Sequence, residues 1–231
     1  MTIGLLVILA ATSTLLTSTR LSASVSDLSQ LQQQGSYALH VIGMQLRQAG
    51  SSDPVLDGVG GRYVFGPDAA TFGSMGAAVW GTTGSATASD SLSVASFAAP
   101  ADGAPKSTWQ RNCIGDAVEK GLVDATFTLD AKGQLQCRSG SRMQPLIENV
   151  ADFRVDYEVD TGHGLQWLDA AAVEQSGLWA AVRAVEVCLD LKGSEQGPDA
   201  GSEYKDCGNT TKPRDGWTHL VFRNVFSLRV P

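Results

Sequence analysis

The first fifty residues, MTIGLLVILAATSTLLTSTRLSASVSDLSQLQQQGSYALHVIGMQLRQAG (residues 1–50), contain no proline and decide the fold. Nearly every residue from Ile3 to Leu16 is apolar or a small hydroxyl, and no charge precedes Arg20. An apolar series then continues in steps of three and four, with Gln32 and Gly35 in two of its slots. Its members are Leu21, Val25, Leu28, Leu39, Ile42, Leu46 and Ala49. This spacing predicts one helix, from near residue 2 to about 49, with an apolar tip and an amphipathic remainder.

The apolar tip is short for a membrane span. At about 1.5 Å per residue, Ile3–Leu16 covers roughly 21 Å, whereas a bilayer core of about 30 Å needs roughly 20 apolar residues. No basic residue precedes the tip and no small-residue cleavage site follows it, so a secretory signal is not indicated. We therefore expect the hydrophobic segment to begin upstream of Met1, in a chain truncated at its N-terminus.

The charge of the chain argues against nucleic-acid binding. The formal net charge is −7, and Arg20, Arg47 and Asp27 give the first fifty residues +1, which leaves −8 for the remainder. A domain this acidic, without a cluster of lysine or arginine, lacks the electrostatic footprint of a DNA- or RNA-binding protein. The 25 glycines favour a loop-rich β domain over residues 51–231 rather than a helical bundle.

The four cysteines lie at positions 113, 137, 188 and 207, with no C-x-x-C pair. This spacing disfavours zinc, and an even number of cysteines beyond a membrane segment fits an oxidising compartment such as the periplasm. Three pairings are open. We favour Cys113–Cys137 and Cys188–Cys207, because a polar, turn-rich stretch flanked by strand-like runs joins each pair.

Several segments show the period-two alternation of half-buried strands. A hairpin is predicted where residues 122–129 and 134–138 flank Asp130–Gly133. Residues 167–175 are expected to form a helical turn. The polar insert over 192–216 is expected to be a loop tied down by Cys188–Cys207. The predicted strands cover residues 92–96, 153–159, 185–191 and 220–230, with weaker extended segments at 62–65 and 77–80.

These elements predict an α+β architecture in which the C-terminal half of the helix covers an antiparallel sheet and the N-terminal half protrudes. Leu39, Ile42 and Leu46 are expected to be buried. The sheet face that receives them is expected to carry Phe153, Val155, Leu189, Phe222 and Phe226.

In this order the segments resemble the PilW-type minor pilins of bacterial type IV pili. The resemblance covers nearly the whole chain. It rests on the N-terminal helix, on SDSLSV with the downstream Cys113-Ile-Gly, on QLQCRSGSRMQPLIENVADFRVDYEVDTGHG, and on WAAVRAVEVCLDLK followed by DGWTHLVFRNVFSLR. The basic leader and the Gly-Phe-Thr-Leu-x-Glu cleavage motif of that family are missing, so no residue here takes the prepilin-peptidase role.

The resemblance implies a pilin-like fold and a structural, non-catalytic role in a tip complex that primes pilus assembly. Its implied partners are other minor pilins, a PilY-type tip adhesin, the major pilin and the inner-membrane assembly platform. The chain would lie in the inner membrane with a periplasmic head, then at the pilus tip. A J-type minor pseudopilin of type II secretion shares the same plan, and a membrane-tethered periplasmic binding module is a third alternative.

The residues indicate no catalytic site, metal site or cofactor. The chain has neither a G-x-S-x-G elbow nor the ligand spacing of a calcium loop. The candidate contacts are therefore interfaces. We expect partners to pack on the helix at Leu21, Val25 and Leu28, and the insert to offer Tyr204 and its neighbour Trp217 as anchors.

Overall fold

The computed structural model describes residues 2–51, 77–85, 88–98, 105–106, 109–119, 121–196 and 202–228. Along the first helix, side chains are described at Ser22 and from Val25 onward. The expected extended segment at 62–65 and the side chain of Leu21 lie outside this description.

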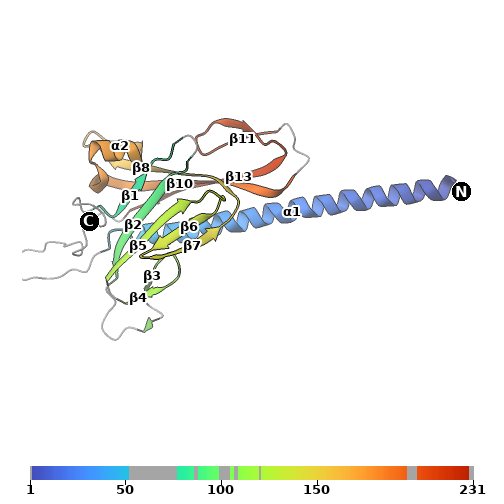
Figure 1. Cartoon of the computed structure of the whole chain (residues 1–231). Coiled ribbons are helices and arrows are strands. Elements are labelled where there is room, and N and C mark those ends of the chain that lie inside the picture. The colour runs from blue at the N-terminus through green and yellow to red at the C-terminus, as the bar shows by residue number, and fades with distance from the viewer. Residues whose placement is uncertain are drawn as a thin grey trace, which may run out of the picture.

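The long N-terminal helix predicted from the sequence is present as α1 (Thr2–Gln48). It ends in a turn at Gly50, whose φ of 72° is a left-handed conformation that glycine adopts without strain. The first half of α1 extends away from the rest of the molecule (Figure 1). The predicted helix and its protruding N-terminal half are therefore confirmed.

A five-stranded antiparallel sheet has the order β1-β2-β5-β6-β7. The hairpin predicted around Asp130–Gly133 joins β5 to β6. The Asp130 Oδ1 atom accepts the N–H groups of Lys132 and Gln134, and Gly133 supplies the positive φ of the turn. The strands are β1 (Val79–Thr82), β2 (Ser91–Ala98), β5 (Gly121–Leu129), β6 (Leu135–Ser139) and β7 (Arg142–Ile147).

A four-stranded antiparallel sheet has the order β13-β10-β8-β9. Its strands are β8 (Val150–Asp160), β9 (Leu165–Asp169), β10 (Val182–Gln196) and β13 (Trp217–Ser227). The pairs Phe153↔Leu189 and Leu189↔Phe222 place the predicted apolar residues on one face, which we call the inner face. Intervening residues such as Cys188 and Asp190 therefore lie on the outer face.

Four short strands and two short helices complete the described fold. The helical turn expected at 167–175 is partly wrong, because residues up to Asp169 belong to β9. Asp169 then caps the helix by accepting the N–H of Ala172. The short elements are α2 (Ala170–Ser176), η2 (Trp179–Ala181), β3 (Gln110–Arg111), β4 (Ala117–Val118), β11 (Glu203–Lys205) and β12 (Thr211–Pro213).

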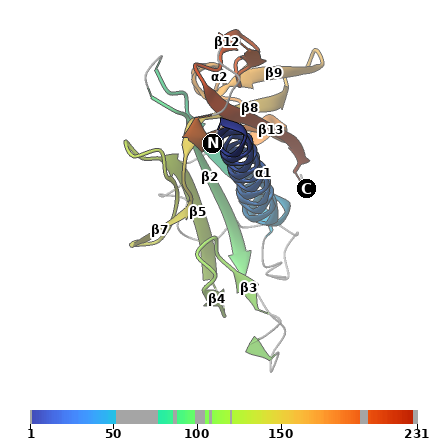
Figure 2. The same ribbon diagram turned by 90° about the vertical axis from the view of Figure 1, so that its right-hand side faces the viewer.

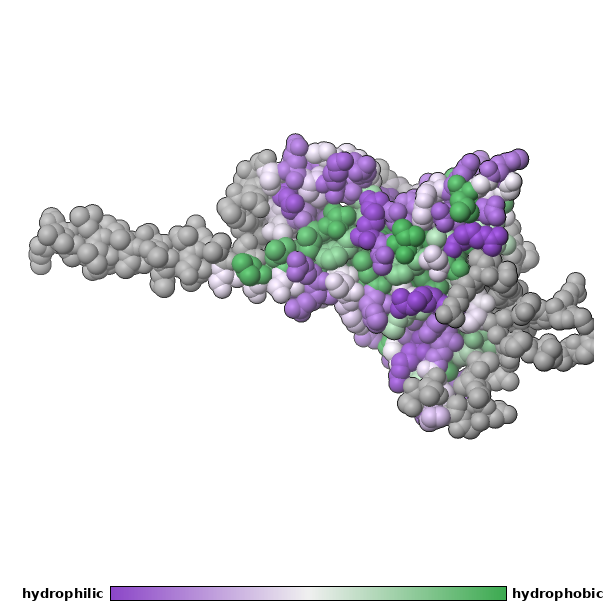
Figure 3. All heavy atoms as spheres, turned by 180° about the vertical axis from the view of Figure 1, so that it is seen from behind, coloured by the Kyte–Doolittle hydropathy of each residue, from purple (hydrophilic) through white to green (hydrophobic). Residues whose placement is uncertain are grey.

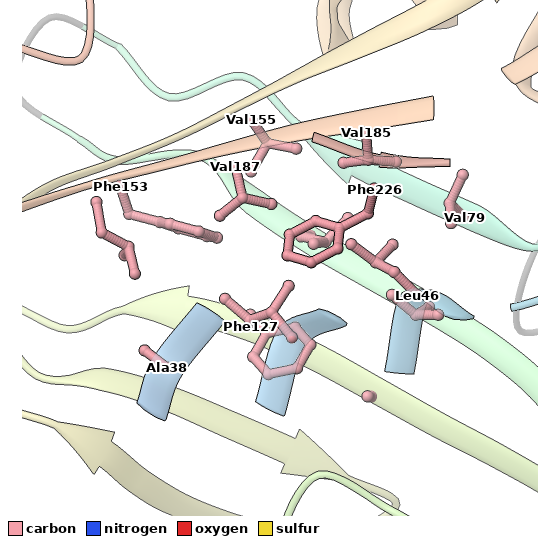
Figure 4. Close-up of a cluster of buried hydrophobic side chains, with 14 of the residues drawn as sticks. Ala38, Leu46, Val79, Phe127, Phe153, Val155, Val185, Val187 and Phe226 are labelled. Atoms are coloured by element: carbon pink, nitrogen blue, oxygen red, sulfur yellow. The ribbon is translucent and has the colours of Figure 1, made fainter. Parts of the chain in front are cut away.

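The C-terminal half of α1 packs in the angle between the two large sheets (Figure 2) and contacts β2, β7, β10 and β13. Ile42 and Leu46 are fully buried, and Leu39 is partly buried against the same core. Figure 4 shows Leu46 and Ala38 meeting side chains of both sheets, among them Phe127 and Phe226. The predicted burial of this half of the helix against the inner face is confirmed.

Two glycines of α1 allow β13 to approach closely. Gly35 lies against the ring of Phe222 and Gly43 lies against the ring of Phe226, and a Cβ at either glycine would overlap the ring. Gly35, which occupies one slot of the apolar series, therefore makes room for the ring of Phe222.

We expect Gly43→Ala to lower the free energy of unfolding by about 1–3 kcal/mol through overpacking, although alanine favours a helix by about 1 kcal/mol. Adding Phe226→Leu, which removes the ring edge, should recover part of that loss. Urea denaturation of the two variants and of Phe226→Leu alone measures this coupling. A Gly43→Ala variant as stable as the wild type would contradict the close contact.

Both disulfides have the pairing favoured from the sequence. Cys113–Cys137 joins the β3–β4 region to β6, with a Cα–Cα distance of 6.2 Å. Cys188–Cys207 joins the outer face of β10 to the segment between β11 and β12, with a Cα–Cα distance of 5.7 Å.

Candidate functional site

The most N-terminal contact described between α1 and the head is a hydrogen-bonded carboxylate. Asp27 is 7% exposed, and its Oδ1 atom accepts the Ser194 N–H at 3.0 Å and the Ser194 hydroxyl at 2.9 Å. Gly193 leaves room for this contact, because a Cβ there would overlap the carboxylate. These contacts fix the position of α1 relative to the end of β10.

Val25 and Leu28 lie close to Asp27 in the sequence of α1, but both side chains are exposed to solvent. Val25 is 63% exposed and Leu28 is 38% exposed, although both belong to the apolar series predicted from the sequence. Figure 3 shows a band of hydrophobic residues that begins where α1 leaves the head and continues onto the head. We call Val25 and Leu28 the exposed helix surface.

The apolar series therefore divides into a group that packs on the core and a group that is exposed to solvent. Leu39, Ile42 and Leu46 face the core, whereas Val25 and Leu28 do not. Between these groups the face of α1 that turns to the head consists of Asp27, Leu31, Gly35 and Ala38. Gln32, which occupies a slot of the predicted series, is exposed.

Two further large side chains are exposed along the docked half of α1, namely Tyr37 and Met44. Tyr37 lines a groove of about 430 Å³ between α1 and the end of β7, together with Gln33 and Gln34. Both residues lie off the apolar series, so its spacing gave no sign of them.

The insert over residues 192–216 is tied down by Cys188–Cys207 as expected, but the expectation that it is a loop is wrong in part. β10 continues to Gln196, and β11 and β12 pair as a hairpin. Asp206 builds the turn by accepting the Thr210 N–H at 2.8 Å, and it pairs with Lys212 at 2.7 Å. Burial opposes ionisation of Asp206, but the hydrogen bonds from Lys212 and Thr210 outweigh this effect and lower its pKa.

Tyr204 is bound to the outer face of the four-stranded sheet. Its hydroxyl donates to Asp190 at 2.8 Å, and its ring stacks on His219 with centroids 4.3 Å apart. Burial and the hydrogen bond to Asp190 raise the pKa of Tyr204. Its role as a partner anchor remains a prediction.

Trp217 is half-buried at the start of β13, and the ammonium of Lys192 lies 4.2 Å from its ring centroid. Both residues line a hollow of about 440 Å³ beside the Asp27–Ser194 contact. The role of Trp217 in partner binding also remains a prediction.

Sequence reasoning missed Asp27 and Ser194, which it treated only as a charge and as part of a polar insert. A lone acid inside an apolar helical series was the available signal, since a buried carboxylate needs hydrogen-bond donors. Among the described residues, no three His, Cys, Asp or Glu side chains are grouped to hold a metal ion. Nor does the described part of the chain include a helix with the length and apolar character of a membrane span.

Comparison with known proteins identifies the family of the chain. Among solved structures, a type IV-like pilin from Thermus thermophilus matches 86% of this chain and 96% of its own, with 15% identity and a TM-score of 0.47. Comparison with curated protein sequences gives no match. The family model for the type IV pilus-assembly protein W matches residues 115–231, half of the chain. The chain therefore belongs to the type IV pilus-assembly protein W family.

Proposed function

We propose that this protein is a minor pilin of a tip or initiation complex that primes pilus polymerisation, with a structural and non-catalytic role. Membership of the pilus-assembly protein W family supports a minor pilin role. The position within the pilus and the partners are part of the proposal.

The observation that carries the proposal is the form of α1. The helix continues from Asp27 back to Thr2, about 38 Å beyond its anchor on the head at about 1.5 Å per residue. Val25 and Leu28 are exposed where this projection begins. An isolated helix in water gains little stability from its own hydrogen bonds, and exposed apolar surface of this kind is typical of an interface.

In this proposal the apolar stretch Ile3–Leu16 lies in the inner membrane before assembly, and the head lies in the periplasm, where both disulfides are stable. On extraction, α1 packs against the helices of other minor pilins and the major pilin. The assembly platform of the inner membrane drives this step, and a PilY-type adhesin binds at the tip.

The β11–β12 hairpin is the candidate contact on the head. It carries both signs of charge, which suits orientation and choice of partner more than affinity. Its attachment through Cys188–Cys207 and Asp190 lowers the cost of ordering it on binding.

Deletion of the gene tests the proposal. We expect loss of surface pili and of twitching motility, with secretion of exoproteins intact, and recovery of both lost phenotypes on complementation. Normal piliation would contradict the proposal. Normal pili combined with lost secretion would instead assign the chain to the J-type pseudopilins.

A further inference from the structure

We propose that the free edge of β9 binds an extended, basic segment of another subunit of the pilus, which adds to the four-stranded sheet as a further strand. This inference rests on the proposed function and specifies a contact of the head that is separate from the exposed helix surface. β9 is the last strand in the order β13-β10-β8-β9, so only one of its two edges is paired. Figure 2 shows the β8–β9 hairpin at the margin of the head.

The register of the β8–β9 hairpin fixes which backbone groups of β9 lie on the free edge. The Thr161 N–H donates to the Gly164 carbonyl at 3.1 Å, and the next pair along the strands is Asp160↔Leu165. Hydrogen-bonded and non-hydrogen-bonded pairs alternate along an antiparallel ladder. The N–H and C=O groups of Leu165 and Trp167 therefore point away from β8. No described residue outside the strand pairs forms a backbone hydrogen bond with these four groups.

β9 lacks the features that protect an edge strand. Natural edge strands often carry proline or lysine, which hinder pairing with another chain. Pro145 lies in β7, an edge strand of the five-stranded sheet, whereas β9 has the sequence LQWLD.

The side chains on the outer face of this edge are apolar and exposed. Leu165 is 58% exposed and Trp167 is 44% exposed. Leu168 packs on the core, so Leu165 and Trp167 project from the opposite, outer face of the sheet by the alternation of a strand. Free backbone groups beside exposed apolar side chains are the arrangement that strand addition uses.

The outer face beside this edge is acidic, and two of its carboxylates have no cation. Asp160 and Glu158 of β8 lie directly across from the two exposed residues of β9, and Asp156 follows on the same face. Asp160 pairs with Arg183 at 3.6 Å, whereas neither Glu158 nor Asp156 forms an ion pair among the described residues. Burial, and then the charge of Glu186, raise the pKa of Asp156.

The charge of this face selects a basic partner strand. An added strand lies two strand spacings, about 10 Å, from β8, a span that a Lys or Arg side chain and the Glu158 side chain cover together. The cation crosses the ring of Trp167, which favours it further. A second copy of this chain is a poor occupant, because pairing two β9 strands about a twofold axis joins one acidic face to another.

The first test removes one backbone donor from the full chain, co-expressed with the other pilins of its gene cluster and purified in detergent. Leu165→Pro deletes an outward N–H without deleting a bond to β8, and we expect at least about tenfold less co-purified partner. Leu165→Ala, the matched control, loses the side chain but keeps the N–H and should stay within about twofold of the wild type. Wild-type co-purification by the folded Leu165→Pro variant would overturn the proposal.

The second test changes the charge beside the edge. Glu158→Lys should lower co-purification by about tenfold and Glu158→Gln by about threefold, whereas Glu158→Asp should retain the partner. The control is Glu119→Lys, because Glu119 is exposed just after β4, at the opposite end of the head from β9 (Figure 2). Equal co-purification by Glu158→Lys and Glu119→Lys would contradict a basic partner.

Thermal unfolding and mapping of both disulfides check the folding of each variant. If Leu165→Pro does not fold, a photoreactive phenylalanine analogue at Trp167 in assembling cells replaces that test. Mass spectrometry of the crosslinked peptide should identify a segment of another subunit with Lys or Arg at alternate positions. No crosslink, a crosslink to a second copy of this chain, or a crosslinked segment without Lys or Arg would overturn the proposal.

Two outcomes separate this inference from the proposed function. If Val25→Asp abolishes co-purification while Leu165→Pro and Glu158→Lys do not, the strand site is wrong and the proposed function stands. If deletion of the gene leaves surface pili normal while the analogue at Trp167 still crosslinks to a basic segment, the proposed function is wrong and β9 binds a protein outside the pilus.

Discussion

Leu46→Ala should lower the free energy of unfolding by about 2–5 kcal/mol, the range for removing a large aliphatic side chain from a packed core. Leu46 has no exposed surface and lies where α1 meets both sheets (Figure 4). The cavity therefore forms at the contact that holds the helix to the head.

Met44→Ala is the matched control for this variant, because Met44 lies on the same helix and is 37% exposed. Its effect should stay below about 1 kcal/mol. Denaturant unfolding with the disulfides intact, followed by tryptophan fluorescence, measures both variants. Equal losses at the two positions would contradict the burial of α1 between the sheets.

Val25→Asp should reduce co-purification of the other minor pilins by at least about tenfold while leaving the thermal stability of the head unchanged. An aspartate at an apolar helix–helix contact is buried without a partner, and such a charge costs several kcal/mol. Because Val25 is 63% exposed in the isolated chain, the same aspartate stays in water there and costs the head little. Leu28→Asp should act in the same way.

Gln30→Asp is the control for this pair. It places the same charge within the same turns of α1, but on the side of the helix away from Val25 and Leu28. It should assemble as the wild type does. Normal assembly of all three variants would place the partner interface elsewhere.

The strands were predictable where one face of a sheet is buried. The alternation through Phe153, Val155 and Tyr157 and through Val185, Val187 and Leu189 survives in the structure, because each strand has one apolar face on the core. The β5–β6 hairpin was predictable for a local reason, since Asp130 and Gly133 build its turn without outside help.

The insert was not predictable in the same way. β11 and β12 have three residues each and little apolar alternation. Their hairpin depends on contacts distant in sequence, namely Cys188–Cys207 and the hydrogen bond from Tyr204 to Asp190. Polar composition correctly marks such a segment as surface, but it cannot supply the tertiary partners that give it structure.

The candidate site, too, was predictable only in part. Spacing along α1 was enough to pick out Val25 and Leu28 as members of the apolar series, and both are exposed; their contact with a partner stays a prediction. The Asp27–Ser194 contact joins residues that are 167 positions apart. A single sequence contains no local pattern for such pairs.

Site-specific photocrosslinking tests most directly whether the exposed helix surface packs against other minor pilins. A photoreactive phenylalanine analogue at Val25 in assembling cells should crosslink to other minor pilins or to the major pilin. The same analogue at Gln175, an exposed position on α2 of the head, serves as the comparison. We predict pilin crosslinks at Val25 that exceed those at Gln175, whereas crosslinks at Gln175 with none at Val25 would contradict the account.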